Sequence, residues 1–194
     1  GDVLSESVRV SALMRLFLDA CVLYPVATRE ILLSYARAGG FAPVWSARAL
    51  EEWARAAAAK MGAEEEARAR GDAALLRAGF PEGEATGWEA REAELWSPDP
   101  ADAHVIAAAE AGAADAIVTF NIRDFPLKAL RPLGLGRLHP DEYLSEALRR
   151  DTQRMEASLA PLASAAAARD APFRRFLKRA ALPRLGKAWE ALQA

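Results

Sequence analysis

Apolar residues follow two patterns along the chain. Short apolar runs, typical of buried strands, occur at 15–18, 41–45, 94–96, 116–119 and 136–138. Elsewhere apolar residues recur every three or four positions, and this spacing predicts helices over 22–38, from Ser46 onward, over 63–78 and over 103–111, with a helical turn over 127–130. Gly39-Gly40 is expected to close the first helix, and Ser46 to cap the second.

The alternation of strands and helices predicts an α/β fold with three layers, α/β/α, around a mainly parallel central sheet. Helices cover both faces of such a sheet, and ligands bind at the carboxyl ends of its strands. After the last strand, residues 140–194 are helical in pattern, and we expect breaks at Pro161, Pro172 and Pro183. The sequence therefore predicts an α/β body followed by a helical C-terminal extension.

Composition is typical of a folded cytoplasmic protein. The chain has 194 residues, 52% of them hydrophobic, and its single cysteine excludes a disulfide scaffold. No stretch reaches the roughly 20 apolar residues of a membrane span, since Arg15 and Asp19 interrupt the most apolar N-terminal run. Residue 1 is Gly and Met14 directly precedes the first strand, so we expect the natural start at Met14 and an N-terminal extension over 1–13.

The net charge of −2 hides a contrast between two parts of the chain. Residues 1–148 carry 15 basic and 23 acidic side chains (−8), whereas residues 149–194 carry 10 basic and 4 acidic ones (+6). The basic tail favours a polyanionic or acidic partner, and a solvated helix face explains it equally well. Helical spacing puts four apolar residues on one side of the tail, namely Phe173, Phe176, Leu177 and Ala180. It leaves four basic residues on an exposed face: Arg174, Arg175, Lys178 and Arg179.

Acidic and amide side chains stand where strands end or helices begin. Asp19 follows the first strand, Asp102 opens the helix over 103–111, and Asn121 and Asp124 follow the strand over 116–119. Adjacent parallel strands end at one edge of a sheet, so these groups are expected to meet there. Clustered carboxylates bind a hard cation such as Mg²⁺ or Mn²⁺, and without one their repulsion raises at least one pKa. Taken alone, Asp102 also fits a helix N-cap and Asp124 an ordinary turn.

The order of these motifs resembles the PIN domain family. The first strand ends in Phe17-Leu18-Asp19-Ala20-Cys21, and Ser46…Glu52-Trp53 follows. The specific part is the pair of blocks Pro98-Asp99-Pro100-Ala101-Asp102-Ala103-His104 and Thr119-Phe120-Asn121-Ile122-Arg123-Asp124-Phe125-Pro126. The resemblance covers about residues 14–145 and implies a PIN-like nuclease domain over 14–148. The basic helical extension over 149–194 is similar to that of one bacterial branch of the family.

The resemblance also implies the roles of individual residues. Four carboxylates are carried over as catalytic residues and metal ligands: Asp19, Glu52, Asp102 and Asp124. Three further side chains are carried over as support: Thr119, Asn121 and Asp99. Glu51 competes with Glu52, which is preferred because it directly precedes an apolar helix residue. Family members commonly have Thr or Ser and then Asn or Ser after the first Asp, whereas Ala20 and Cys21 stand here, so hydrogen bonds that orient a ligand are expected to be lost.

PIN domains are metal-dependent ribonucleases, many of them VapC-type toxins of bacterial toxin–antitoxin pairs. The resemblance therefore implies hydrolysis of single-stranded RNA with Mg²⁺ or Mn²⁺, with an antitoxin protein and a second copy of the chain as candidate partners. A PIN-like module that binds RNA or protein without cutting is the alternative. A haloacid-dehalogenase-like phosphatase fits poorly, because Cys21 stands where it needs its second acid. His104 and His139 are interpreted as structural, and Cys21 as a small buried hydrophobe.

Overall fold

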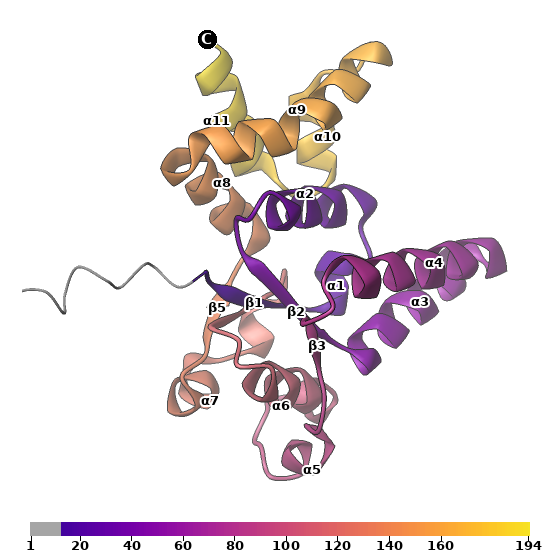
Figure 1. The fold of residues 1–194 in the computed structure, drawn as a ribbon, viewed down its shortest axis with the longest axis vertical. Coiled ribbons are helices and arrows are strands. Elements are labelled where there is room, and N and C mark those ends of the chain that lie inside the picture. The colour runs from indigo at the N-terminus through magenta and orange to yellow at the C-terminus, as the bar shows by residue number, and fades with distance from the viewer. Residues whose placement is uncertain (1–12) are drawn as a thin grey trace, which may run out of the picture.

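The computed structural model describes residues 13–194, and its centre is a sheet of five parallel strands (Figure 1). The strands are β1 (Arg15–Leu18), β2 (Ala42–Ser46), β3 (Glu84–Ala85), β4 (Ala116–Val118) and β5 (Gly136–Leu138), in the order β3-β2-β1-β4-β5. All four pairings are parallel, so every strand ends at the same edge of the sheet. The predicted extension over 1–13 lies outside the described residues, apart from Leu13.

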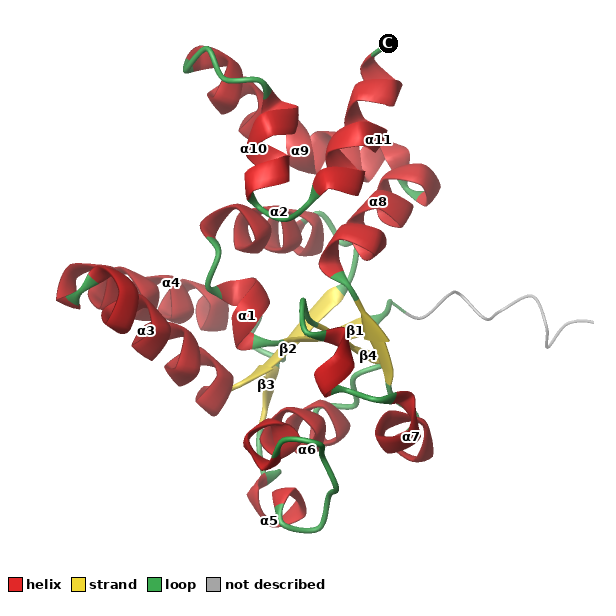
Figure 2. Ribbon diagram, turned by 180° about the vertical axis from the view of Figure 1, so that it is seen from behind, coloured by secondary structure: helices red, strands yellow, loops and turns green. Residues whose placement is uncertain are grey.

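Helices cover both faces of the sheet, as the alternation of strands and helices predicted (Figure 2). Successive residues of a strand point to opposite faces, so Leu16 and Leu18 join one hydrophobic cluster while Phe17 joins the other. The first face is covered by α1 (Ala20–Leu23), α2 (Val26–Arg37), α3 (Ala47–Met61), α4 (Ala63–Gly79) and the C-terminal helices. The second is covered by α6 (Ala103–Ala111) and α7 (Leu127–Leu130), and α5 (Glu89–Glu92) packs on the far side of α6. The predicted three-layer α/β/α architecture is confirmed.

Two predicted elements differ in the structure. The helix expected over 22–38 is divided into α1 and α2 at Pro25, because Pro25 has no N–H with which to continue α1 and is itself extended (ψ 121°) as the N-cap of α2. The strand expected over 94–96 is wrong, since these residues lie in the connection that follows α5. The edge strand beside β2, on the side away from β1, is β3 at Glu84–Ala85. Two residues of mixed polarity carry no periodic signal, so the sequence did not reveal β3.

The C-terminal part consists of α8 (Pro140–Arg150), α9 (Thr152–Ala168), α10 (Phe173–Arg179) and α11 (Pro183–Gln193). Pro172 and Pro183 stand at helix starts, as expected, but the predicted break at Pro161 is wrong, because this residue lies inside α9. Pro161 lacks the N–H that would bond to the carbonyl of Ala157, and both residues are exposed, so water can satisfy that carbonyl. Packing of the opposite face of α9 then keeps the helix continuous.

The C-terminal helices pack against the sheet body and are not a detached tail. Met155, Leu159, Leu177 and Leu185 are fully buried in the same hydrophobic cluster that contains Leu16 of β1. The carboxylate of Asp141 in α8 accepts hydrogen bonds from the backbone N–H groups of Arg184 (3.0 Å) and Leu185 (2.9 Å), which caps the start of α11. Across residues 13–194, no helix is both long enough and apolar enough to cross a membrane.

Candidate active site

The strand register builds the first part of the site. Leu18 of β1 pairs with Val118 of β4, so the next residues along these strands, Asp19 and Thr119, lie side by side at the carboxyl edge of the sheet. The Thr119 hydroxyl donates a 2.8 Å hydrogen bond to Oδ2 of Asp19. The backbone N–H of Asn121 in turn donates to Thr119 Oγ1 at 3.0 Å. Thr119 thus supports Asp19 directly, whereas Asn121 acts on it through its backbone and has an exposed side chain.

Cys21 has a polar role that the sequence interpretation missed. Its thiol donates to Asp19 Oδ2 at 3.2 Å, lies 3.4 Å from Thr119 Oγ1, and accepts a hydrogen bond from the backbone N–H of Phe120. Burial, followed by the negative charge of Asp19, raises the thiol pKa to about 12, so the thiol stays protonated and remains a donor. The interpretation of Cys21 as a plain buried hydrophobe is therefore wrong. The hydrogen bond expected to be lost at this position is supplied by sulfur.

Glu51 and Glu52 of α3 point to different sides of the helix. Arg70 of α4 binds both carboxylate oxygens of Glu51, at 2.7 and 3.0 Å, and this pairing lowers the pKa of Glu51 to about 2. The Glu52 carboxylate instead lies 2.7 Å from Nε2 of His104, and its charge acts on Asp19. The geometry therefore favours Glu52 over Glu51 as the site residue.

His104 is buried, as a structural histidine should be, but it also holds Glu52. It lies on α6, on the other face of the sheet from the helix pair α3–α4, and its ring packs beside Trp88 with the ring centroids 6.0 Å apart. Its Nδ1 atom is buried with no hydrogen-bond partner among the described residues, so Nε2 is its link to the site. A histidine on an apolar helix gives no sequence signal for this contact, since Glu52 is 52 positions away.

The other predicted residues lie in two short 3₁₀ segments near this edge. Asp102 ends η1 (Pro100–Asp102) and precedes α6, but its side chain makes no capping hydrogen bond, so the N-cap interpretation is not supported. Asp99 performs that task for η1, accepting from the N–H of Ala101 at 2.9 Å. Asp124 ends η2 (Ile122–Asp124) and is exposed to solvent.

Burial and, to a smaller extent, mutual repulsion act on the pKa values of the acids. Burial raises the pKa of Asp19, which is 9% exposed; the hydrogen bonds from Cys21 and Thr119 oppose this rise and the charge of Glu52 adds to it. Burial also raises the pKa of Asp102, to about 6, and the charges of Asp124, Asp99 and Asp19 contribute. These directions agree with the expected rise of at least one carboxyl pKa, with burial as the larger cause and repulsion as the smaller one. Asp102 feels both Asp19 and Asp124, so the acids share one electrostatic environment.

The charge and the donor atoms of this cluster fit a divalent cation. Every ion pair of a lysine or arginine in residues 13–194 goes to a carboxylate other than Asp19, Asp102 and Asp124. The donors are carboxylate oxygens, which Mg²⁺ and Mn²⁺ prefer. Within the same residues, however, no three His, Cys, Asp or Glu side chains are already close enough together to hold an ion. Convergence of the four acids on one metal centre stays a prediction.

The raised pKa of Asp102 predicts how stability depends on pH in metal-free buffer. Between the ordinary value of 3.8 and about 6, the folded protein retains a proton that the unfolded chain releases. The folded state then binds more protons, so the contribution of Asp102 to the free energy of unfolding falls as pH rises through this window. Thermal unfolding in EDTA, compared with Asp102→Asn, measures it. The substitution should raise the melting temperature more at pH 7 than at pH 4, and an equal effect at both would contradict the prediction.

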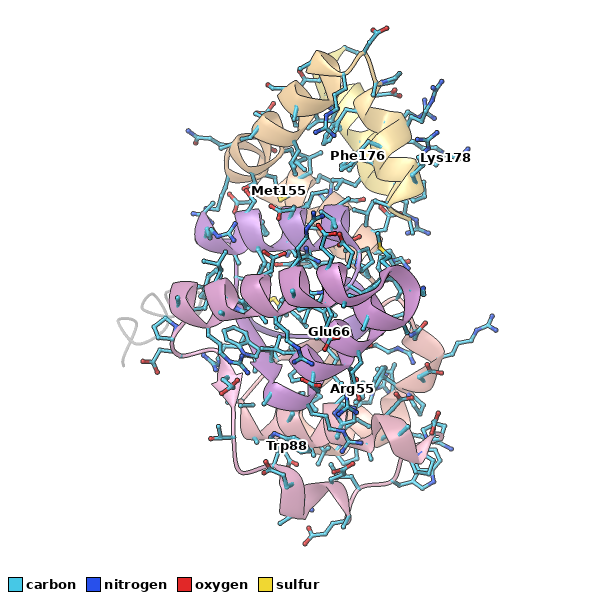
Figure 3. All side chains as sticks on the ribbon, turned by 90° about the vertical axis from the view of Figure 1, so that its right-hand side faces the viewer. Arg55, Glu66, Trp88, Met155, Phe176 and Lys178 are labelled. Atoms are coloured by element: carbon cyan, nitrogen blue, oxygen red, sulfur yellow. The ribbon has the colours of Figure 1, made fainter. Side chains whose placement is uncertain are left out.

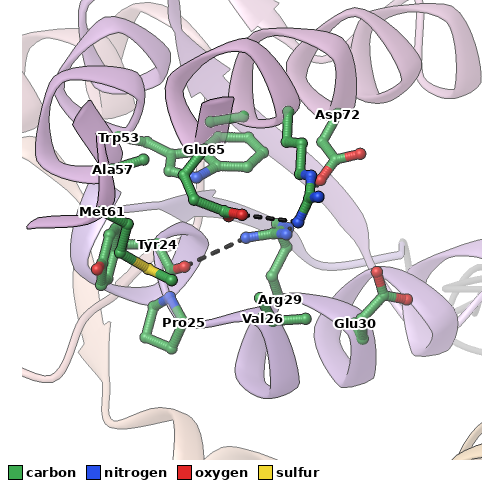
Figure 4. Close-up of a pocket in the computed structure, with 12 residues that line it drawn as sticks. Tyr24, Pro25, Val26, Arg29, Glu30, Trp53, Ala57, Met61, Glu65 and Asp72 are labelled. Atoms are coloured by element: carbon green, nitrogen blue, oxygen red, sulfur yellow. Dashed lines mark hydrogen bonds and ion pairs between the residues drawn. The ribbon is translucent and has the colours of Figure 1, made fainter. Parts of the chain in front are cut away.

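A pocket lies elsewhere, between the α1–α2 segment and the α3–α4 pair (Figure 4). Its volume is about 420 Å³, and Arg29 and Trp53 are prominent in its wall. The Arg29 guanidinium donates to the carbonyl of Leu23 at 2.6 Å, pairs with Asp72 at 3.1 Å and lies 4.5 Å from the centroid of the Trp53 ring. Because its donors are already engaged in joining α2 to α4, Arg29 is a structural residue.

The predicted basic face of the tail is confirmed. The four basic residues of α10 are exposed, while Phe173 and Leu177 are buried and Phe176 and Ala180 half-buried. In Figure 3 the Lys178 side chain points away from the molecule. Arg174 is paired with Glu190 of α11 at 2.8 Å, so its charge is partly compensated.

Comparison with known proteins agrees with this arrangement. A family model described as "PIN domain" matches residues 15–123, more than half of the 194-residue chain. A segment of 47 residues, 24% of the chain, is 47% identical to "Putative ribonuclease VapC50" of Mycobacterium tuberculosis. That segment covers 28% of the relative's length, so the similarity is local. No solved structure matches the chain significantly.

Proposed function

Since the chain belongs to the PIN domain family, we propose that it is a ribonuclease that hydrolyses single-stranded RNA with Mg²⁺ or Mn²⁺, as the toxin of a toxin–antitoxin pair. The observation that carries the proposal is the buried carboxylate of Asp19, which has no cationic partner among residues 13–194 and is close enough to Glu52 and Asp102 for their charges to interact. Such a site stabilises the folded protein poorly by itself, and a divalent cation would compensate its charge. The relative named as a VapC ribonuclease supports the toxin assignment.

The roles of the residues follow from their contacts. Asp19, Glu52, Asp102 and Asp124 would hold the cation, which when bound acidifies water and neutralises charge on the phosphate. Thr119 and Cys21 both donate to Oδ2 of Asp19, which fixes the orientation of that carboxylate. His104 does the same for Glu52. No protein nucleophile is needed for this reaction.

The test of the proposed function is cleavage of an unstructured RNA oligonucleotide. The protein should cut it in the presence of Mg²⁺ or Mn²⁺ and not in EDTA, and it should cut a duplex of the same sequence much more slowly. In parallel, either cation should raise the melting temperature, because a ligand that binds only the folded state stabilises it. Binding of RNA without cleavage under any of these conditions would favour the non-catalytic alternative.

The basic face of α10 is proposed to guide the RNA backbone toward the acidic edge. If Arg175 and Arg179 each contact a phosphate, reversing both to Glu should reduce the salt dependence of RNA binding by a slope of about 1.4, since each contact to a single strand contributes roughly 0.7. The control replaces Arg37 and Lys60, which are exposed on α2 and α3, with Glu, and its salt dependence should stay that of the parent protein. An unchanged slope for the α10 variant would leave docking of an acidic antitoxin segment as the role of this face.

A further inference from the structure

Trp96 is a solvent-exposed aromatic side chain in the connection that leads from α5 to Asp102. It is 56% exposed, whereas every other aromatic residue of the described part of the chain is buried or half-buried. A single exposed apolar residue is ordinary on a protein surface, so exposure alone decides nothing. The neighbours of Trp96 are what give it significance.

Trp96 precedes the segment that carries Asp102 and contacts the helix that follows Asp124. It lies three residues before Asp99, at most about 11 Å along the chain, and Asp99 opens the segment that ends in Asp102. Lys128 of α7, four residues after Asp124, places its ammonium group 4.4 Å from the centroid of the Trp96 ring. This cation–π contact holds the ring against α7 and brings a positive charge next to it. The ring is thereby positioned between the chain segments of Asp102 and Asp124.

Trp96 also lines a hollow of about 490 Å³, large enough for a small planar ligand. Leu95, Pro100 and Ala103 contribute apolar wall, and the charged residues on its border are Glu89 and Glu92. Glu92 is paired with Arg48, while Glu89 is exposed and has no ion-pair partner among residues 13–194. The negative charge of these glutamates repels a phosphate group but does not repel an uncharged nucleobase.

We propose that Trp96, held by Lys128, is a stacking platform for one nucleobase of the single-stranded RNA near the scissile phosphate. The inference rests on the proposed function and specifies how that site holds its substrate. An acidic edge repels an RNA backbone until a cation is bound, so a contact that does not depend on charge is needed there. Stacking of a base on an aromatic ring is such a contact, and it tolerates any sequence because every base has a flat face.

Equilibrium binding of an RNA of about 12 nucleotides tests the platform, with Asp19→Asn as background so that the RNA stays intact. Each position of the oligonucleotide is made abasic in turn. With Trp96 present, loss of the base at one position or two adjacent ones should weaken binding roughly ten- to a hundredfold. In Trp96→Ala the same loss should change binding less than about twofold, since the stacking partner is already gone. Trp96→Phe should keep the sensitivity.

The control is Leu75→Ala on α4, which removes a side chain of similar exposure (69%) that takes no part in the contact of Trp96 with Lys128. It should bind and respond like the parent protein, and melting temperatures should show that all variants fold. The platform is overturned if loss of a base still weakens binding to Trp96→Ala, or if Trp96→Ala binds intact RNA as tightly as the parent protein. Either result leaves the ribonuclease proposal in place. If abasic RNA binds more weakly only when Trp96 is present, but the parent protein never cleaves RNA, the proposed function is overturned and the stacking platform is kept. A protein that binds no RNA overturns both.

Discussion

Replacing Asp19 with Asn should lower the rate of metal-dependent RNA cleavage by about a thousandfold or more. Loss of a cation that stabilises charge in the transition state removes several kcal/mol, and each 1.36 kcal/mol is a factor of ten. The fold should survive, because Asn keeps a side-chain oxygen that can accept the hydrogen bonds from Thr119 and Cys21. Burial penalises the charged form of Asp19, so the metal-free variant should melt at a higher temperature than the parent protein.

Glu51→Gln is the matched control for this experiment. It also removes one carboxylate charge, but from a residue paired with Arg70 on the surface of α3 and α4. Its cleavage rate should stay within about twofold of the parent rate, as expected for an exposed ion pair. Cleavage by Asp19→Asn at the parent rate would rule out Asp19 as a metal ligand. Loss of the metal-induced rise in melting temperature, seen together with lost cleavage, would separate a binding defect from misfolding.

Truncation after Leu148 should abolish cooperative folding. It removes five side chains that are fully buried: Met155, Leu159, Leu177, Leu182 and Leu185. Burial of a side chain of this size contributes about 1.5–3 kcal/mol, so their loss costs about 7–15 kcal/mol, which equals the whole stability of an ordinary domain. Circular dichroism during heating should show no sigmoidal transition for the fragment.

A shorter truncation, after Trp189, controls for the loss of chain length. The residues it removes, 190–194, are all exposed, and the ion pair of Glu190 with Arg174 lies on the surface. Its melting temperature should change little. A fragment 1–148 that melts cooperatively near the temperature of the full chain would show that the C-terminal helices are dispensable for folding.

The elements that the sequence predicted correctly are those with an uninterrupted pattern. The apolar run over 116–118 and the helix over 103–111 both have clear ends, and both are found. β3 was not predicted because packing, and not a local pattern, determines its position. An added Cβ at Gly83 would lie 2.1 Å from the Trp45 ring, so only glycine lets this segment approach β2. Leu95-Trp96 was misassigned for the opposite reason, since an exposed tryptophan and a buried one look alike in a sequence.

Some residues of the candidate site could be predicted from the sequence and others could not. Asp19, Asp102 and Asp124 could be proposed from their places after strands and before a helix, because strand ends meet in a parallel sheet. Glu52 came from the family resemblance, since one glutamate in a charged helix has no distinguishing pattern. The contacts of Cys21 depend on strand register, and the contact of His104 depends on how α6 brings its ring to Glu52 of α3; a single sequence specifies neither.

The pairing of β1 with β4 and the burial of Leu185 determine the stage of synthesis at which the chain can fold. β1 lies at the centre of the sheet, yet the Thr119 that supports Asp19 is added 100 residues later, and the last buried residue of the core another 66 residues after that. At about 5–20 residues per second, a ribosome needs on the order of 10–30 s to pass from β1 to Leu185. Until then the nascent chain exposes an incomplete hydrophobic core, and its carboxylates have not been brought together. Cooperative folding, and with it the proposed metal site, therefore becomes possible only after residue 185 has been synthesised.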